Sequence, residues 1–177
     1  MNVHSSSRRR QGMTPRTERC SGASGQTIRL NQSLIAWLDS LAPWTHAFTV
    51  TCKRGSDRSQ INQSILIDAA HHFVYRVRRK CYKSSGRRQN LLPVTASYGW
   101  GAYGDHPHLH FCFAGPNGMD FSTFSSILEE SAKKTFWLNR QMRVEPYRDS
   151  GWMQYLVEHG ADHLIVSLIN PSSSKSA

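Results

Sequence analysis

The sequence lacks closely spaced cysteines and long apolar runs. Its four cysteines are so widely scattered that no CxxC or similar zinc-binding pair exists. No stretch comes near the roughly eighteen apolar residues of a transmembrane helix, and the N-terminus has no apolar segment typical of a signal peptide. We therefore expect no membrane contact and a cytoplasmic location, where thiols such as Cys52 and Cys112 stay reduced and serve as small core residues.

Acidic residues are scarce relative to basic ones. The 177 residues include 22 Lys and Arg but only 12 Asp and Glu, which gives a net charge of +10 and a pI of about 9.9. About half of that excess lies in residues 1–30, which contain six arginines and one glutamate. A charge of this size favours a polyanionic partner, most simply nucleic acid. The alternative is a basic protein whose charge serves only its solubility.

Large apolar residues are almost missing from residues 1–27, which are rich in Ser, Arg and Gly. This composition predicts a disordered basic leader, and the Ser-rich residues 171–177 predict a disordered tail. Residues 28–170 remain, and they provide enough chain for one domain with a real core but not for two.

Hydrophobic periodicity predicts an α+β fold. Alternating apolar residues predict strands over 45–53, 91–98, 107–113 and 141–147, and a last apolar strand over 164–169. Apolar residues at helical spacing predict helices over 34–41, 61–81, 121–137 and 152–159. The order strand, helix, strand, strand, helix, strand is that of a ferredoxin-like split βαβ domain. We expect a four- to five-stranded antiparallel sheet with both long helices on one face and strand 107–113 near its centre.

An unusual run of histidines begins at His106 and continues into the predicted strand at 107–113. His106, His108 and His110 alternate with other residues, so their imidazoles project from one face of the strand. Two imidazoles one pleat apart, about 6.5 Å between Cα atoms, can converge on one divalent cation. We prefer His108 and His110, because the apolar Leu109 separates them, and keep His106 with His108 as an alternative pair. The remaining possibility is a solvated strand face that is simply rich in histidine.

Four features together resemble the HUH endonuclease superfamily, and most of all the rolling-circle replication initiators of plasmids and phages. They are the strand 48–51, the cluster His108-Leu109-His110, the helix 151–160 and the basic surface. The resemblance covers roughly residues 44–160. It implies that the paired imidazoles hold Mg²⁺ or Mn²⁺, and that a tyrosine attacks single-stranded DNA to leave a 5′-phosphotyrosine link and a free 3′-OH. The implied partners are single-stranded or hairpin DNA at a replication origin and, as a further possibility, host replication proteins.

Tyr155 is the nucleophile that the resemblance implies, because it lies on the short helix where the family places its tyrosine. A second tyrosine one turn away is absent from the sequence, which implies single-tyrosine chemistry. Tyr98, Tyr103 and Tyr147 are weaker candidates. Tyr155 could instead anchor its helix to the sheet together with Trp152.

His159 is four residues after Tyr155, on the same helical face, and could supply a third metal ligand. It could equally offset the helix dipole. The sequence also departs from the family pattern at two places. The strand preceding the histidines carries no carboxylate between residues 95 and 98, and Glu158 occupies a position where many relatives have lysine. These departures leave open a catalytically impaired DNA-binding regulator. A single-strand transposase or relaxase on the same fold, or a metal-independent RNA-binding protein, is also compatible with these residues.

Candidate DNA contacts come from the basic end of helix 61–81 and from the loop beside the histidine strand. Cations there either contact phosphates or only offset the helix dipole, and an aromatic residue either stacks on bases or packs. The residues that we expect to contact DNA are Arg78, Arg79, Lys80, Arg87, Arg88 and Trp100.

Overall fold

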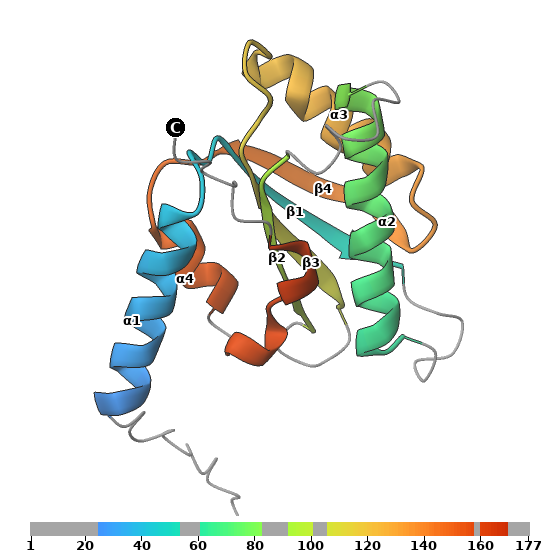
Figure 1. Cartoon of the computed structure of the whole chain (residues 1–177). Coiled ribbons are helices and arrows are strands. Elements are labelled where there is room, and N and C mark those ends of the chain that lie inside the picture. The colour runs from blue at the N-terminus through green and yellow to red at the C-terminus, as the bar shows by residue number, and fades with distance from the viewer. Residues whose placement is uncertain (1–24, 54–60, 83–91, 101–105, 158–159, 170–177) are drawn as a thin grey trace, which may run out of the picture.

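The computed structural model describes residues 25–53, 61–82, 92–100, 106–157 and 160–169. The element order along the chain, shown in Figure 1, is α1 (Gly25–Ser40), β1 (His46–Cys52), α2 (Gln63–Tyr82), β2 (Val94–Gly99), β3 (His108–Phe113), α3 (Phe121–Lys133), β4 (Leu138–Pro146) and α4 (Gly151–Val157), followed by two 3₁₀ turns. None of the helices in these ranges is long and apolar enough to cross a membrane.

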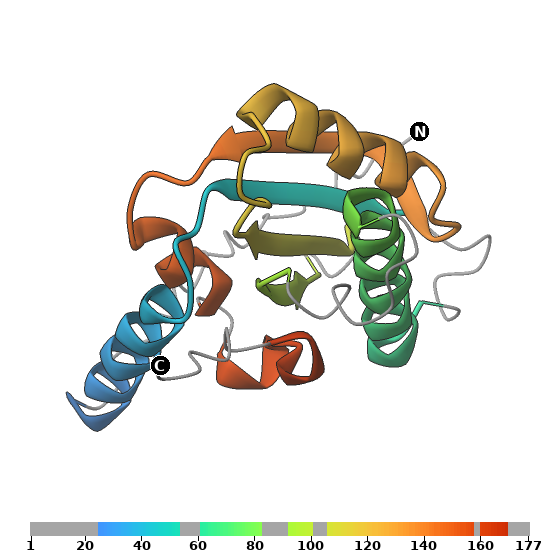
Figure 2. The same cartoon turned by 45° about the horizontal axis from the view of Figure 1, so that its top comes forward.

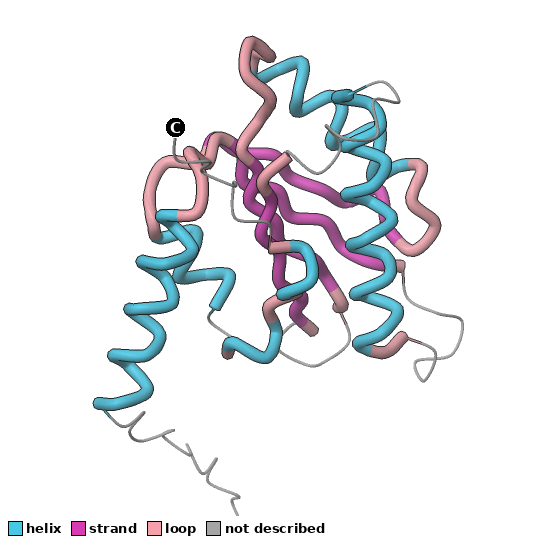
Figure 3. Tube along the Cα trace, in the orientation of Figure 1, coloured by secondary structure: helices cyan, strands magenta, loops and turns pink. Residues whose placement is uncertain are grey.

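The four strands form one antiparallel sheet in the order β2-β3-β1-β4. Figure 3 shows them side by side as the magenta segments of the tube. This is the ferredoxin-like split βαβ arrangement, so the predicted α+β fold is confirmed, with four strands. The histidine strand β3 lies between β2 and β1, as expected from its place after a hairpin connection.

The predicted strand at 164–169 is wrong. Leu164 makes one isolated bridge to Ser97 of β2, and the chain then turns into a 3₁₀ helix over Val166–Leu168. The amides of Leu168 and Ile169 donate to carbonyls three residues earlier instead of to β2. The segment is apolar because Leu168 and its neighbour Ile165 are buried against the core, and burial of this kind does not require strand pairing.

Several element boundaries also differ from the expectation. The helix α1 begins at Gly25, inside the segment expected to be disordered, whereas residues 1–24 and 170–177 lie outside the described residues. The helix α3 ends at Lys133 because the amides of Thr135 and Leu138 donate to carbonyls three residues back, which forms a tight turn into β4. The strand β2 begins only after Pro93, which has no N–H to donate to a strand partner.

The main core lies between the sheet and the helices α2 and α3, which cover one face of the sheet in Figures 1 and 2. Alternate residues of β3, Leu109, Phe111 and Phe113, are fully buried on this face. The ring of Phe73 on α2 lies 4.9 Å from that of Phe111 and 5.2 Å from that of Phe48 on β1. Each fully buried phenylalanine contributes roughly 1.5–3 kcal/mol of transfer free energy. These contacts hold β3 rigidly in the middle of the sheet.

The opposite face of β3 carries the histidines and Cys112, and helices α1 and α4 cover only part of it. Cys112 packs in a second apolar cluster with Leu38 of α1 and Met153 and Leu156 of α4. Burial raises the pKa of the Cys112 thiol far above its ordinary value, and raises that of the Cys52 thiol to about 12. Both cysteines are therefore inert core residues, as predicted. Because α4 is anchored at the Cys112 end, it is positioned directly beside His110.

Candidate active site

His108 and His110 lie one pleat apart on the same face of β3, away from α2 and α3. Their ring centroids are 4.6 Å apart with an interplanar angle of 72°. The register places His110 opposite Ser97 on β2 and Thr49 on β1. His110 is only 2% exposed, whereas His108 is half-buried, so the pair opens to solvent on the His108 side. The structure thus brings together the two imidazoles that the sequence predicted as a pair.

Hydrogen bonds on Nδ1 orient both rings. The Nδ1 of His108 lies 2.7 Å from the carbonyl oxygen of His106, and because a carbonyl oxygen only accepts, this nitrogen donates. In the neutral ring the lone pair of His108 is therefore on Nε2. The Nδ1 of His110 lies 2.9 Å from the hydroxyl oxygen of Thr49. Partners on the second ring nitrogen orient metal-binding histidines in the same way. His106 therefore contacts His108 through its backbone carbonyl, and it lies just before the first residue of β3.

Gly99 makes room for the His108 ring. It is the register partner of His108 on β2, and a Cβ at this position would lie 2.5 Å from the His108 Nε2. Real side chains do not approach so closely, so the ring can occupy its position only beside glycine. Sequence reasoning missed this role, because the pairing of residues 99 and 108 is visible only once the strand register is known.

Tyr155 of α4 lies directly against the imidazole pair. Its ring centroid is 4.7 Å from that of His110, in an edge-to-face arrangement with an interplanar angle of 76°. Trp152, one turn earlier, lies 5.6 Å from Tyr155 and 6.2 Å from His110. Tyr155 is nevertheless 43% exposed. Its ring therefore contacts both His110 and solvent, and Trp152 packs beside it.

The alternative tyrosines are engaged elsewhere. Tyr98 is buried, donates its hydroxyl to the carbonyl of Asp162 at 3.3 Å, and has a pKa raised mainly by burial. Tyr147 donates to a carboxylate oxygen of Asp39, and burial followed by that hydrogen bond raises its pKa far above the ordinary value. A phenol that holds its proton so firmly is a poor nucleophile. Tyr103 lies outside the described residues.

An open polar surface extends from the histidines across β1 and β4. Thr49 on β1 is opposite both His110 and Arg143, so these three side chains share one face of the sheet. Because strands are spaced about 4.8 Å apart, Arg143 lies about 10 Å from His110 measured between Cα atoms. Its side chain is 76% exposed and forms an ion pair with Glu145 at 2.7 Å. We call this surface the open floor; it is formed by Thr49, Thr51, Gln141 and Arg143.

Hollows lie at both ends of the open floor. One, of about 510 Å³, is lined by Thr51, His106 and Gln141, among others. The other, of about 410 Å³, is lined by Arg143 and Trp152 together with residues at the end of β4. Sequence reasoning missed Arg143, although the alternation of polar and apolar residues along β4 could have placed it on this face.

A groove of about 560 Å³ runs beside Tyr155, between α1 and α4. It is lined by three side-chain amides, which can donate and accept hydrogen bonds. They lie beside Tyr155, where the exposed part of its ring meets solvent. The residues that line the groove are Asn31, Gln32, Ile35, Gly151, Gln154, Tyr155 and Val157.

The imidazole pair would offer a divalent cation only two protein ligands. Within the ranges that the structure describes, no group of three or more His, Cys, Asp or Glu side chains could share one ion. Glu158 and His159, the predicted third-ligand candidate, lie outside those ranges. Two imidazole nitrogens leave most positions of a roughly six-coordinate ion to water and phosphate oxygens. Mn²⁺ accepts imidazole more readily than Mg²⁺ does, because harder ions prefer oxygen ligands.

The predicted DNA contacts that lie among the described residues are not brought to this face. Arg78 is half-buried, where desolvation lowers its pKa, and its guanidinium donates to the carbonyl of Leu92 at 3.4 Å. Lys80 forms an ion pair with Glu130. Arg79 is exposed on α2, on the opposite side of the sheet from the histidines. Trp100 packs against the main core. Arg87 and Arg88 lie outside the described residues.

Neither the family models, nor the curated proteins, nor the solved structures include a match to this chain. What can be inferred of its function therefore comes from the geometry of His108, His110 and Tyr155.

Proposed function

We propose that this protein is a DNA endonuclease and strand transferase that nicks and rejoins single-stranded DNA, and that it initiates rolling-circle replication at an origin. The contact between Tyr155 and His110, which itself contacts His108, is the observation that carries the proposal. A partly exposed phenol beside a pair of oriented imidazoles suits the transfer of a phosphodiester to tyrosine, because imidazoles can act as a base or hold a metal beside the nucleophile. We place this activity in the cytoplasm, with single-stranded or hairpin origin DNA as substrate and host replication proteins as further partners.

The reaction exchanges one phosphate ester bond for another in each direction. The Tyr155 oxygen forms a bond to phosphorus while the bond between phosphorus and the 3′ oxygen breaks. The phenol releases its proton, and the departing 3′ oxygen takes one up. The products are a 5′-phosphotyrosyl link and a free 3′-OH that can prime synthesis. The same steps in reverse rejoin the strand, because the energy of the broken bond is kept in the covalent link.

His108 and His110 would hold Mg²⁺ or Mn²⁺ through ring nitrogens other than the oriented Nδ1 atoms. When bound, such an ion supplies positive charge that offsets the charge developing on the phosphate. The His106 carbonyl and the Thr49 hydroxyl keep the rings in position. Since the Tyr155 ring covers the edge of His110, its side chain has to rotate towards solvent as the phosphate enters, and its 43% exposure leaves room for this.

The open floor provides a path for the strand on either side of the scissile phosphate. Arg143 contributes a cation for a neighbouring phosphate, and the Thr49 and Thr51 hydroxyls and the Gln141 amide contribute neutral hydrogen-bonding groups. The amides of the groove beside Tyr155 lie where they can meet the edges of nucleotides next to the cleavage point. The floor thus combines a phosphate contact with groups that can read bases.

The proposal is tested with labelled single-stranded DNA from the protein's own genetic element, incubated with and without Mn²⁺. We expect an SDS-resistant protein–DNA band that requires Mn²⁺ and disappears in Tyr155→Phe and in His108→Ala/His110→Ala. Tyr82→Phe is the control, because Tyr82 lies on α2, where it packs against the main core on the opposite side of the sheet from the histidines. A covalent band that persists in Tyr155→Phe refutes the assignment.

The fate of the 3′ end separates initiation from related activities. A replication initiator leaves a 3′-OH that a polymerase extends, whereas a single-strand transposase or relaxase joins the covalently held 5′ end to another strand without net synthesis. Extension of the labelled 3′ product by an added DNA polymerase, on the same origin template, is the expected result. Strand joining without extension would assign the chain to the second class.

A catalytically impaired DNA-binding regulator is the second candidate. It is favoured by the lack, in the described ranges, of a third His, Cys, Asp or Glu side chain beside His108 and His110. This candidate predicts salt-sensitive binding to hairpin or single-stranded DNA with no cleavage at any Mn²⁺ concentration. The covalent-band assay therefore decides between the two functions.

A further inference from the structure

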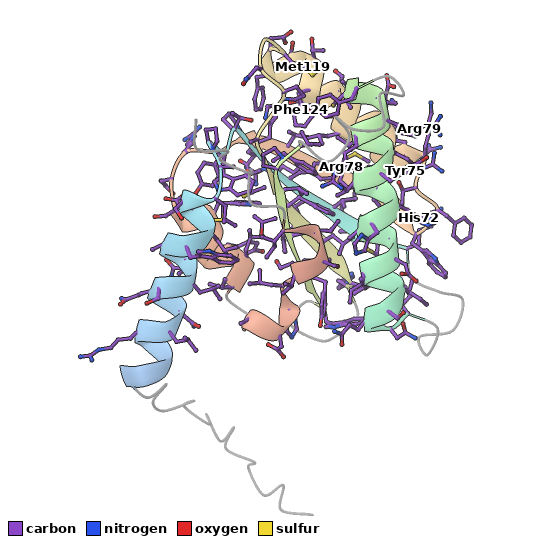
Figure 4. The ribbon with its side chains drawn as sticks, viewed as in Figure 1. His72, Tyr75, Arg78, Arg79, Met119 and Phe124 are labelled. Atoms are coloured by element: carbon purple, nitrogen blue, oxygen red, sulfur yellow. The ribbon has the colours of Figure 1, made fainter. Side chains whose placement is uncertain are left out.

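A second groove lies on the other side of the molecule, between α2 and α3. It has a volume of about 530 Å³. Figure 4 shows His72, Tyr75 and Arg79 along the outer side of α2, while Arg78 lies towards the sheet. The residues that line the groove are His72, Tyr75, Arg76, Arg79, Lys80, Ser131 and Lys134.

The spacing of the lining residues follows the helix. Positions 72, 75, 76 and 79 follow the helical pattern i, i+3, i+4, i+7 and therefore form one face of α2. The buried apolar residues of α2, such as Phe73 and Val77, form the face that meets the sheet. Lys134 approaches from the C-cap of α3, across the groove. The helix is thus apolar towards the core and basic and aromatic towards the groove.

Three cations of the groove have no ion-pair partner among the described residues. Arg76, Arg79 and Lys134 form no ion pair in the described part of the chain, whereas Lys80 is paired with Glu130. No Asp or Glu is among the described residues that line the groove. Ser131 also lines this groove, and its buried hydroxyl has no hydrogen-bond partner among the described residues. The groove therefore presents cations to a ligand that carries negative charge.

An exposed aromatic ring lies among these cations. Tyr75 is 52% exposed, and the guanidinium carbon of Arg79 lies 5.7 Å from its ring centroid. Helix dipoles account for cations in a last helical turn, as at Arg79 and at the α3 C-cap. They do not account for Arg76, which lies more than one turn before the end of α2, or for a large ring left in solvent. Cations beside a partly exposed ring form a typical surface for single-stranded nucleic acid.

We propose that this groove is a second binding site for single-stranded nucleic acid, in which Arg76, Arg79 and Lys134 contact phosphates and a base stacks on Tyr75. The site does not depend on the reaction proposed at Tyr155, because it lies on the opposite side of the sheet. One segment of a strand bound here leaves the open floor free for another. The protein can thereby hold DNA while a different segment enters or leaves the imidazole site.

The first test counts the strands that the protein binds. A short labelled oligothymidylate is titrated in the absence of divalent cation, and complexes are counted by native mass spectrometry. We expect two oligonucleotides per wild-type chain and one per Arg76→Gln/Arg79→Gln chain. The control is Lys133→Gln/Arg140→Gln, which removes the same charge from exposed residues that do not line the groove and should retain two. Equal stoichiometry in the two double variants would overturn the proposal.

The second test separates stacking from charge. Tyr75→Ala should weaken oligothymidylate binding to the groove by about tenfold, the range expected from losing one base–aromatic stack. The same variant should bind an abasic strand, which keeps its phosphates but has no bases, as tightly as the wild type. Equal loss for both strands would mean that Tyr75 acts only through the fold. A thermal melting curve for each variant identifies that outcome.

A docked acidic protein segment is the rival occupant. Polyglutamate is therefore added as a competitor at the same charge concentration as the oligothymidylate. Nucleic-acid binding predicts that it displaces the oligonucleotide much less effectively, because it cannot stack on Tyr75; equal displacement would overturn the proposal. The outcome is independent of the nickase test, since formation of the covalent band at Tyr155 on a short substrate should be unchanged in Arg76→Gln/Arg79→Gln.

Discussion

The His108 ring occupies the space that a side chain on Gly99 would need. The two residues are register partners on β3 and β2, and a Cβ on Gly99 would lie 2.5 Å from the His108 Nε2. That nitrogen is also the one that carries the lone pair, because Nδ1 donates to the His106 carbonyl. The position of a proposed metal ligand therefore depends on the absence of a side chain on the neighbouring strand.

Gly99→Ala should displace the His108 ring and weaken binding of Mn²⁺ by about tenfold or more, the range seen when support for a ligand is lost. Mn²⁺ affinity is measured by electron paramagnetic resonance with a non-cleavable single strand present. The fold should persist, because alanine is tolerated in strand backbones. In a His108→Ala background the same change should have almost no effect, because the clash is gone. A full effect in that background would contradict this account of Gly99.

Thr49→Val removes the hydroxyl that lies 2.9 Å from the His110 Nδ1 while keeping the shape of the side chain. We expect a tenfold to hundredfold loss of Mn²⁺-dependent nicking, about the loss typical of a group that orients a metal ligand, and a stability cost of about 1 kcal/mol. Thr135→Val is the control, because the buried hydroxyl of Thr135, just after α3, donates to the Ser131 carbonyl and not to a histidine. Its Mn²⁺ requirement should match that of the wild type.

Arg143→Gln should weaken binding of single-stranded DNA and lower the slope of log affinity against log salt by about 0.7, the value for one phosphate contact. Arg143 shares the histidine face, whereas Arg140 lies in the irregular stretch of β4 between Leu138 and Met142 and lines neither hollow of the open floor. Arg140→Gln is therefore the control and should leave the slope for a strand held at the open floor unchanged. An equal fall in both variants would mean that only net charge matters there.

Acid should destabilise the protein through His46. Its ring is buried between Phe121, whose ring centroid is 4.3 Å away, and Phe124, at 4.8 Å. Desolvation lowers the pKa of His46 below its ordinary value of 6.5, although a hydrogen bond to the Phe121 carbonyl partly opposes this. A lowered pKa means that the unfolded chain takes up a proton first, so stability is unaffected above the ordinary value and falls as the pH drops below it.

Urea unfolding measured from about pH 8 to about pH 5 checks this linkage. His46→Phe keeps an aromatic ring between Phe121 and Phe124 but cannot titrate, so its midpoint should fall less over the same range. Asp120 does not confuse the result. Hydrogen bonds from Ser122 and Thr123 lower the pKa of its carboxyl, so its contribution is lost only as the pH falls below that of an ordinary aspartate. Parallel pH curves for the two proteins would disprove the role of His46.

Local patterns in the sequence were sufficient to predict much of the fold. Alternation along 107–113 predicted that His108 and His110 share a face, because the two-residue period of a strand is a local property. The segment at 164–169 shows where local patterns fail. An apolar run is compatible both with a strand and with irregular chain packed on a core, and only the hydrogen bonds to β2 distinguish them.

What the sequence determined by itself is the order of the elements, the pairing of two imidazoles on one strand face and the place of Tyr155 on a short helix. Which phenol meets the imidazoles was decided only by tertiary structure, since Tyr147 is held by Asp39, more than a hundred positions away. The same holds for Gly99 beside His108 and for the separation of Arg79 from the histidine face. These relationships depend on strand register and helix rotation, which pair residues distant in the chain and leave no periodic trace in it.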